Sequence, residues 1–122
     1  MALNQVLCEN EPIHLVGRIQ QFGKLIIQNE HREIIALSEN WSNYINNQDL
    51  TYFLGKPMEQ FVARLEEVVQ EPLRSFIDAI APTSSDRHVM QLELGKQNHI
   101  VKAYRVHQDL HIEFEEVGDV NE

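Results

Sequence analysis

Val89-Met-Gln-Leu-Glu-Leu94, Ile100-Val-Lys-Ala-Tyr-Arg-Val106 and Leu110-His-Ile-Glu-Phe-Glu115 are three runs of side chains with a period of two. Neighbouring side chains of a strand point to opposite faces, so one face of each run can be buried while the other meets water. The connections at residues 95–98 and 107–109 contain turn-forming glycine, asparagine and aspartate. This stretch therefore predicts a three-stranded antiparallel meander.

Two further strands are expected earlier in the chain. Residues 24–28 form a short, mainly apolar run, and residues 32–37 form a second one after a polar turn at residues 29–31. Short apolar runs bounded by turn residues are typical of paired, buried strands. We therefore expect these two runs to pair with each other.

The middle of the chain has helical spacing instead. A short helix over residues 41–45 is predicted, with Ser38 and Asn40 as N-cap candidates, and residues 46–49 are expected to be a loop. Pro72 should break or kink the longer helical region, or begin a second helix, because it has no amide hydrogen. The apolar stripe on which that region depends consists of Phe61, Val62, Leu65, Val68, Val69, Leu73, Phe76, Ile77 and Ile80.

Strands on both sides of a helical region predict an α+β domain, with a five-stranded antiparallel sheet and helices on one face. Residues 1–22 are expected to be an extended N-terminal arm, because Pro12 disfavours a helix there. Residues 23–117 would form the domain, and residues 118–122 a polar tail or linker.

Composition bounds the function. The chain has 122 residues, a formal net charge of −9 and a single cysteine, Cys8. An acidic surface without a basic stripe repels phosphate backbones and anionic lipids, so we expect neither a nucleic-acid nor a membrane partner. No signal peptide or membrane span is evident, and one cysteine cannot form an internal disulfide. A cytoplasmic location is therefore expected.

The N-terminal segment carries the most specific motif of the chain. Spaced as Cys-x-x-Glu-Pro-Ile-His-x-x-Gly-x-Ile-Gln-x-x-Gly, it consists of Cys8, Glu11, Pro12, Ile13, His14, Gly17, Ile19, Gln20 and Gly23. This motif resembles the start of the bacteriophytochromes, a family of biliverdin-binding red/far-red photoreceptors. The rest of the chain is compatible with their N-terminal PAS domain, so the resemblance implies a PAS-like fold.

The resemblance also implies roles for individual residues. Cys8 would be the covalent attachment point of the linear tetrapyrrole biliverdin, which a downstream GAF domain holds. Ile13, His14 and Ile19 would make contacts where the arm threads through a loop of the GAF domain, with Ile19 at the centre of the knot. The sequence departs from the family pattern at Val16 and at Gln21-Phe22, where the family often has Pro and Pro-His.

Other chemistry finds little support in the sequence. His107 and His111 are four residues apart, but a predicted turn separates them, and the other histidines have no ligand spacing. We expect solvated histidines and no metal site. The carboxylates of residues 113–116 and 66–71 are expected on solvated faces, and no catalytic arrangement is evident, so an enzyme is not expected.

Two functions remain. The first is the N-terminal PAS domain of a bacteriophytochrome-like photoreceptor, which binds biliverdin only when a GAF domain is present in the same or another chain. The alternative is a stand-alone PAS module for protein–protein interaction, dimerisation or small-ligand sensing. A homodimer is compatible with either function.

Overall fold

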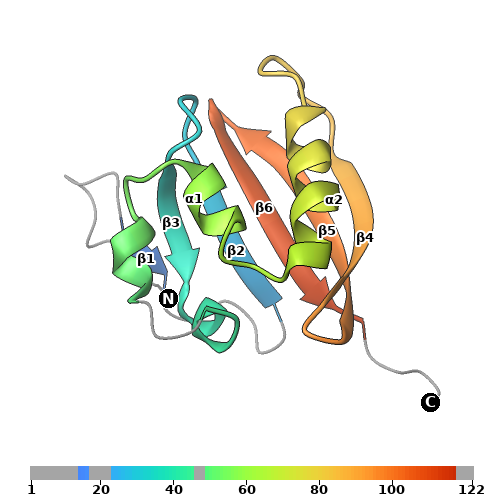
Figure 1. Cartoon of the computed structure of the whole chain (residues 1–122). Helices are drawn as coiled ribbons and strands as arrows, with labels where there is room; N and C mark the ends of the chain where they lie inside the picture. The colour runs from blue at the N-terminus through green and yellow to red at the C-terminus, as the bar shows by residue number, and fades with distance from the viewer. Residues whose placement is uncertain (1–13, 17–22, 46–48, 118–122) are drawn as a thin grey trace.

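The computed structural model describes residues 14–16, 23–45 and 49–117. One sheet forms a layer, and its helices lie on one face of it (Figure 1). In chain order the elements are β1 (His14–Val16), β2 (Gly23–Gln28), β3 (Ile34–Ser38), the 3-10 helices η2 (Glu39–Asn43) and η3 (Leu50–Phe53), α1 (Met58–Val62), α2 (Glu67–Asp78), β4 (His88–Leu94), β5 (Gln97–Val106) and β6 (Asp109–Glu116).

The predicted meander is confirmed. Strands β4, β5 and β6 are antiparallel neighbours, and β2 continues the sheet beside β6, in the order β1-β3-β2-β6-β5-β4. Both hairpins turn within two residues, since Leu94 pairs with Gln97 and Val106 pairs with Asp109. Gly95 and Lys96 have φ values of 62° and 67°, as expected for a tight turn that matches the strand twist.

The sheet has one strand more than the sequence predicts. The five antiparallel strands are present, but β1, within the expected arm, pairs in parallel with β3, so that His14 lies opposite Ala36 and Val16 opposite Ser38. Three residues are too few to show a period of two, so only the edge offered by β3 identifies them as a strand. The arm is therefore partly built into the sheet.

Pro72 was expected to break or kink the helical region, or to begin a second helix. The structure shows neither a break nor a helix start at Pro72. It lies inside α2, and the chain breaks earlier, in the turn after Val62. A proline removes the hydrogen bond to the carbonyl four residues earlier, which here belongs to Val68. Val68 is 74% exposed, so this part of α2 faces solvent. The same exposure shows that Val68 is not part of the buried stripe.

The short helices also differ from expectation. Ser38 precedes η2 but makes no side-chain cap; its hydroxyl accepts a hydrogen bond from the amide of Leu25 at 2.9 Å and donates to Asn40 at 2.7 Å. The helix η3 was not predicted, and Asp49 caps it by accepting from the amide of Thr51 at 3.1 Å.

Aromatic rings fill the centre of the core between helices and sheet. Trp41 is fully buried, and its ring contacts Phe61 and Phe114 edge-on at centroid distances of 5.1 and 4.9 Å. Its indole N–H donates to the carbonyl of Leu25 at 3.1 Å. Edge-to-face rings add attraction beyond their buried area, so this cluster ties η2 and α1 to the sheet.

Candidate functional site

The structure describes only one of the predicted arm residues, and it does not test their roles. Cys8, Ile13 and Ile19 lie outside the described residues, and His14 is described as the first residue of β1. The pairing of β1 with β3 places residues 14–16 of the arm at the edge of the sheet. The attachment role of Cys8 therefore stays a prediction. The first described residues after Cys8 are those of β1.

A buried charge lies where the chain enters the sheet after the arm. Lys24 is the second residue of β2, and only 4% of its surface is exposed. Its Nζ atom lies 3.0 Å from Nε2 of His99 and 3.7 Å from a carboxylate oxygen of Glu116. The same ammonium lies over the ring of Tyr44, 4.8 Å from its centroid. We call these four residues the junction cluster.

Hydrogen bonding assigns the protons within the junction cluster. His99 Nδ1 lies 2.9 Å from the carbonyl oxygen of Gln97, which can only accept, so Nδ1 carries the hydrogen and donates. Nε2 is then the acceptor of a neutral imidazole, and the Lys24 ammonium donates to it. Burial lowers the pKa of both side chains, and the nearby Glu116 carboxylate opposes this in each case.

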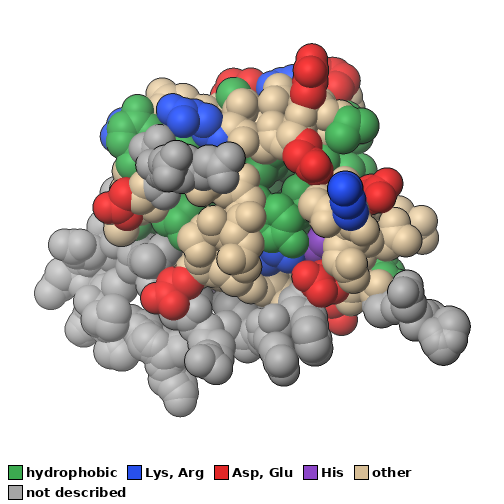
Figure 2. Space-filling model, turned by 60° about the horizontal axis from the view of Figure 1, so that its bottom comes forward, with side chains coloured by type: hydrophobic (Ala, Val, Ile, Leu, Met, Phe, Trp, Pro, Cys, Tyr) green, Lys and Arg blue, Asp and Glu red, His purple; other side chains and the backbone are tan. Residues whose placement is uncertain are grey.

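Strand register explains why these residues meet. Lys24 lies opposite Phe114, and His99 lies opposite Glu116, so neighbouring strands β2, β6 and β5 bring their ends together. Figure 2 turns this end of the molecule forward and shows a histidine flanked by basic, acidic and apolar side chains. The cluster thus joins the first strand after the arm to the last strand before the C-terminal tail.

Sequence reasoning missed this cluster, although part of the signal was present. The period of two places Lys24 on the same face of its strand as the buried Ile26, and it places His99 with the buried Val101. The expectation that all histidines are solvated is therefore wrong for His99, which is 1% exposed. Which lysine would face which histidine depends on the strand order, which the sequence does not contain.

The remaining predicted groups behave mostly as surface groups. His31 and His107 are exposed, and His111 is half-buried and stacked on Tyr104 at 5.4 Å. Glu115 pairs with Lys102 at 3.2 Å on the open face of the sheet. Within residues 14–16, 23–45 and 49–117, no group of three or more His, Cys, Asp or Glu side chains could hold a metal ion.

Two hollows lie at the opposite end of the sheet, beside the turn between β2 and β3. One has a volume of about 190 Å³ and the other about 280 Å³, and Gln28 and Arg32 line both. The first opens between the turn and the helices α1 and α2, and the second opens between the turn and the connector that follows α2.

Comparison with known proteins assigns the family. A family model described as PAS fold matches residues 8–117, which is most of the chain. The chain belongs to the PAS fold family. It is also similar to the crystal structure of a sensory box sensor histidine kinase from Vibrio cholerae, with a TM-score of 0.59 and 15% sequence identity, covering 82% of this chain and 85% of that one. No curated protein matches the chain.

Within this PAS domain, the two candidate regions lie at opposite ends of the sheet. The junction cluster lies where the arm and the tail meet the domain, and the hollows lie at the turn between β2 and β3. None of the helices in the described part of the PAS domain is both long and apolar enough to cross a membrane.

Proposed function

We propose that this chain is the N-terminal PAS domain of a bacteriophytochrome-like red/far-red photoreceptor. In this proposal Cys8 is the covalent anchor of biliverdin, and a downstream GAF domain in the same or another chain holds the pigment. The PAS domain supplies the anchor and passes the light signal on together with the GAF domain. The motif from Cys8 to Gly23 is the basis of the proposal, and the following observations support it.

The family match agrees with the proposal in its extent, and it agrees equally with a PAS domain of another function. The match to the PAS fold begins at Cys8 itself and not at β2, where the antiparallel sheet begins. The family therefore includes the arm as well as the globular part.

The position of β1 adds a geometric argument. Six residue steps separate Cys8 from His14, the first residue of β1. An extended chain covers at most about 3.3–3.6 Å per residue, so the thiol can reach about 20 Å from the sheet edge. That reach suits an anchor that extends from the PAS domain to a pigment held by a neighbouring domain.

The size of the hollows also favours a pigment held elsewhere. Pockets for drug-sized ligands commonly measure about 300–1,000 Å³. The hollows at the turn between β2 and β3 measure about 190 and 280 Å³, too small for a molecule with four pyrrole rings. Ile13, His14 and Ile19 would then contact the GAF domain, and none of them would form a pocket by itself.

The proposed attachment needs no oxidant or reductant. The Cys8 thiol adds across a vinyl group of the tetrapyrrole, so that one carbon–sulfur bond forms and the thiol proton ends on the other vinyl carbon. The thiolate is the reactive form, and Glu9 and Glu11 disfavour it by their charge. Groups of the GAF domain or of the pigment would have to stabilise it.

The experiment uses the receptor in which this PAS domain precedes its GAF domain. It is mixed with biliverdin and denatured, and zinc-induced fluorescence then reports covalently bound pigment. We expect Cys8→Ser to abolish the fluorescent band, and we expect Ser42→Ala, an exposed hydroxyl change in η2, to leave it intact. A band that persists in Cys8→Ser would refute the anchor.

The alternative is a stand-alone PAS module for protein–protein interaction, dimerisation or small-ligand sensing. One observation favours the ligand-sensing form: a buried amide oxygen of Gln28 lacks a partner beside the hollows. Native mass spectrometry of the 122-residue chain tests this function. A retained small molecule or a dimer would support it, and a bare monomer would count against it.

A further inference from the structure

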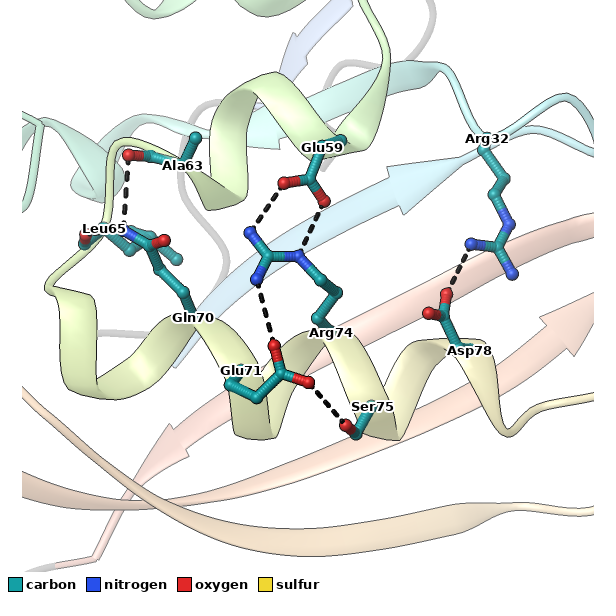
Figure 3. A network of polar contacts seen from close by, with 9 residues as sticks. All are labelled: Arg32, Glu59, Ala63, Leu65, Gln70, Glu71, Arg74, Ser75 and Asp78. Atoms are coloured by element: carbon teal, nitrogen blue, oxygen red, sulfur yellow. Dashed lines mark hydrogen bonds and ion pairs between the residues drawn. The ribbon is translucent and has the colours of Figure 1, made fainter.

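The flank of α2 that faces α1 is charged. Arg74 donates two hydrogen bonds to the carboxylate of Glu59 in α1, at 2.9 and 2.6 Å. Arg32, in the turn between β2 and β3, donates to the carboxylate of Asp78 at 2.6 Å. Figure 3 shows both pairs bridging from α2 to the elements opposite it. The charges on this flank therefore bind the helix to its own domain.

The opposite flank of α2 carries no charge. Val68, Pro72 and Phe76 follow one another at intervals of four residues, so they lie on one side of the helix. Val68 is 74% exposed, Pro72 is exposed, and Phe76 is only partly buried. Since α1 lies on the other side of α2, these residues are on the side of β4, against which α2 packs (Figure 1). We call them the apolar flank.

Strand β4 is the outermost strand on this side of the sheet. It pairs with β5 over its whole length without a bulge, and no strand in the described part of the chain pairs with its outer side. Edge strands are usually protected from further pairing by proline, lysine or a bulge. The sequence His88–Leu94 contains neither proline nor lysine. Strand β4 therefore offers a free edge to another strand.

The hairpin of β4 and β5 shows which backbone groups are free. Leu94 and Gln97 flank its two-residue turn and form a hydrogen-bonded pair, and bonded and non-bonded pairs alternate from there. The next pair, Glu93 and Asn98, is then non-bonded. In agreement, the carbonyl of Asn98 accepts from the amide of Val117, on the other side of β5, at 2.9 Å. The groups that point outward belong to Val89, Gln91 and Glu93.

Side chains near the two ends of β4 have opposite charges. Glu93 is exposed near one end, and Arg87 is exposed just before the other. Both lie on the open face of the sheet, because they are an even number of residues apart. The Arg87 guanidinium lies over the ring of Tyr104, 5.2 Å from its centroid, which places it on that face. The edge therefore carries one acidic and one basic group that face the same way.

This arrangement is complementary to itself. When two β4 strands pair antiparallel with Met90 opposite Met90, Arg87 of each copy lies opposite Glu93 of the other. Val89 of each copy then lies opposite Gln91 of the other, so the free backbone groups bond in pairs. Opposite charges directly across two strands attract. One register thus satisfies the free backbone edge and both charges.

We propose that two copies of this chain pair through the free edges of β4 in this register. A two-fold axis perpendicular to the sheet relates the copies, so the two sheets continue each other and both α2 helices lie on the same face. The apolar flank of each helix then faces that of the other copy above the paired strands. Contact between these flanks removes apolar surface from water, which favours the dimer.

Pairing through β4 rests on the dimerisation form of the alternative function, and it adds the surface and the register. It does not involve Cys8, so it is also compatible with the photoreceptor proposal. A dimer that forms through another surface would keep the alternative function and overturn the pairing through β4.

The first test is sedimentation velocity of the 122-residue chain over a range of concentrations. We expect a monomer that converts to a dimer as the concentration rises. A chain that stays monomeric at the highest concentration that remains soluble would overturn the proposal.

The second test uses disulfide cross-linking in a Cys8→Ser background. Met90 bonds toward β5, so it faces its copy as a non-bonded pair, with Cα atoms about 4.5 Å apart, which a disulfide can span. Oxidation of Met90→Cys should therefore give a covalent dimer. Val106→Cys is the control, because Val106 is 42% exposed at the end of β5 and should give little dimer. Equal cross-linking of both variants, or none at position 90, would overturn the proposal.

The third test reverses the charges. Arg87→Glu and Glu93→Arg should each weaken the dimer about tenfold, because each places like charges opposite one another twice, and the double variant should recover. With a net charge of −9, general repulsion would grow in Arg87→Glu and fall in Glu93→Arg, so weakening by both is specific to the pair. Lys56→Glu, beside α1, is the control with the same change in net charge as Arg87→Glu and should leave the affinity nearly unchanged. No recovery in the double variant would overturn the proposed register.

Discussion

The junction cluster makes a double-mutant prediction that separates a buried charge pair from an apolar contact. His99→Leu removes the acceptor of the buried Lys24 ammonium, which is 4% exposed. Lys24→Met removes the charge but leaves Nε2 of His99 without a donor. The double variant replaces both groups with apolar side chains, so no buried polar atom of this pair remains unsatisfied.

The magnitudes follow from the environment. Loss of one partner from a buried pair costs about 3–5 kcal/mol. We expect the lower end for His99→Leu, since Glu116, 26% exposed, stays 3.7 Å from the ammonium. Lys24→Met should cost about 1 kcal/mol, because an unpaired imidazole nitrogen replaces an expensive buried charge. The free energy of unfolding of the double variant should be within about 1 kcal/mol of the wild-type value or higher than it.

Urea unfolding measures these differences. Trp41 is the single tryptophan and is fully buried, so its fluorescence reports the core. With a typical urea slope, His99→Leu should lower the midpoint by about 2 M, and the double variant should restore it. The exposed pair of Lys102 and Glu115 is the control, and its cycle should show less than about 1 kcal/mol of coupling. A double variant as unstable as the sum of both single variants would refute the reasoning.

Three further predictions concern titration and the helix. Burial and the Glu113 carboxylate raise the pKa of Tyr104 to about 12. Ultraviolet absorbance should therefore show one phenol that ionises at higher pH than an ordinary tyrosine, and in Glu113→Gln its pKa should fall but stay above the ordinary value. An unchanged titration in Glu113→Gln would contradict this. Burial lowers the pKa of His99 and of His111 in the folded state. Below the ordinary histidine pKa of about 6.5, the unfolded chain therefore binds more protons than the folded chain, and the folded state loses stability as the pH falls. The urea midpoint of the wild type should therefore fall on acidification, and that of His111→Phe should fall less. An equal fall in the wild type and in His111→Phe would argue against histidine protonation as the cause. Pro72→Ala should raise the free energy of unfolding by about 1 kcal/mol, because it restores a helical amide donor, and a lower urea midpoint would count against this.

The regular parts of the fold could be predicted from local pattern. The meander over β4, β5 and β6 was predictable because each strand alternates over several residues, and a slip of one residue would expose its apolar face. The position of the helix break was not predictable in this way. Pro72 suggested a break at its own position, yet α2 continues through it, with Pro72 on the exposed side of the helix.

The candidate sites were less predictable than the fold. The motif around Cys8 identified the arm, and the family match includes it. The burial of Lys24 and His99, and the unpaired oxygen of Gln28, were missed, because polar residues in short strands look like surface residues when the inward face is unknown.

The sequence by itself determined the five longer strands, the antiparallel meander and the presence of a helical region, because alternation and helical spacing are local properties of the chain. It also supplied the cysteine motif on which the photoreceptor proposal rests. Only the tertiary structure decided that β1 adds a parallel edge strand, that Lys24 meets His99, and that Gln28 ends at a groove. These depend on the order in which strands pair, which brings together side chains distant in the chain and sets which of them lose contact with water.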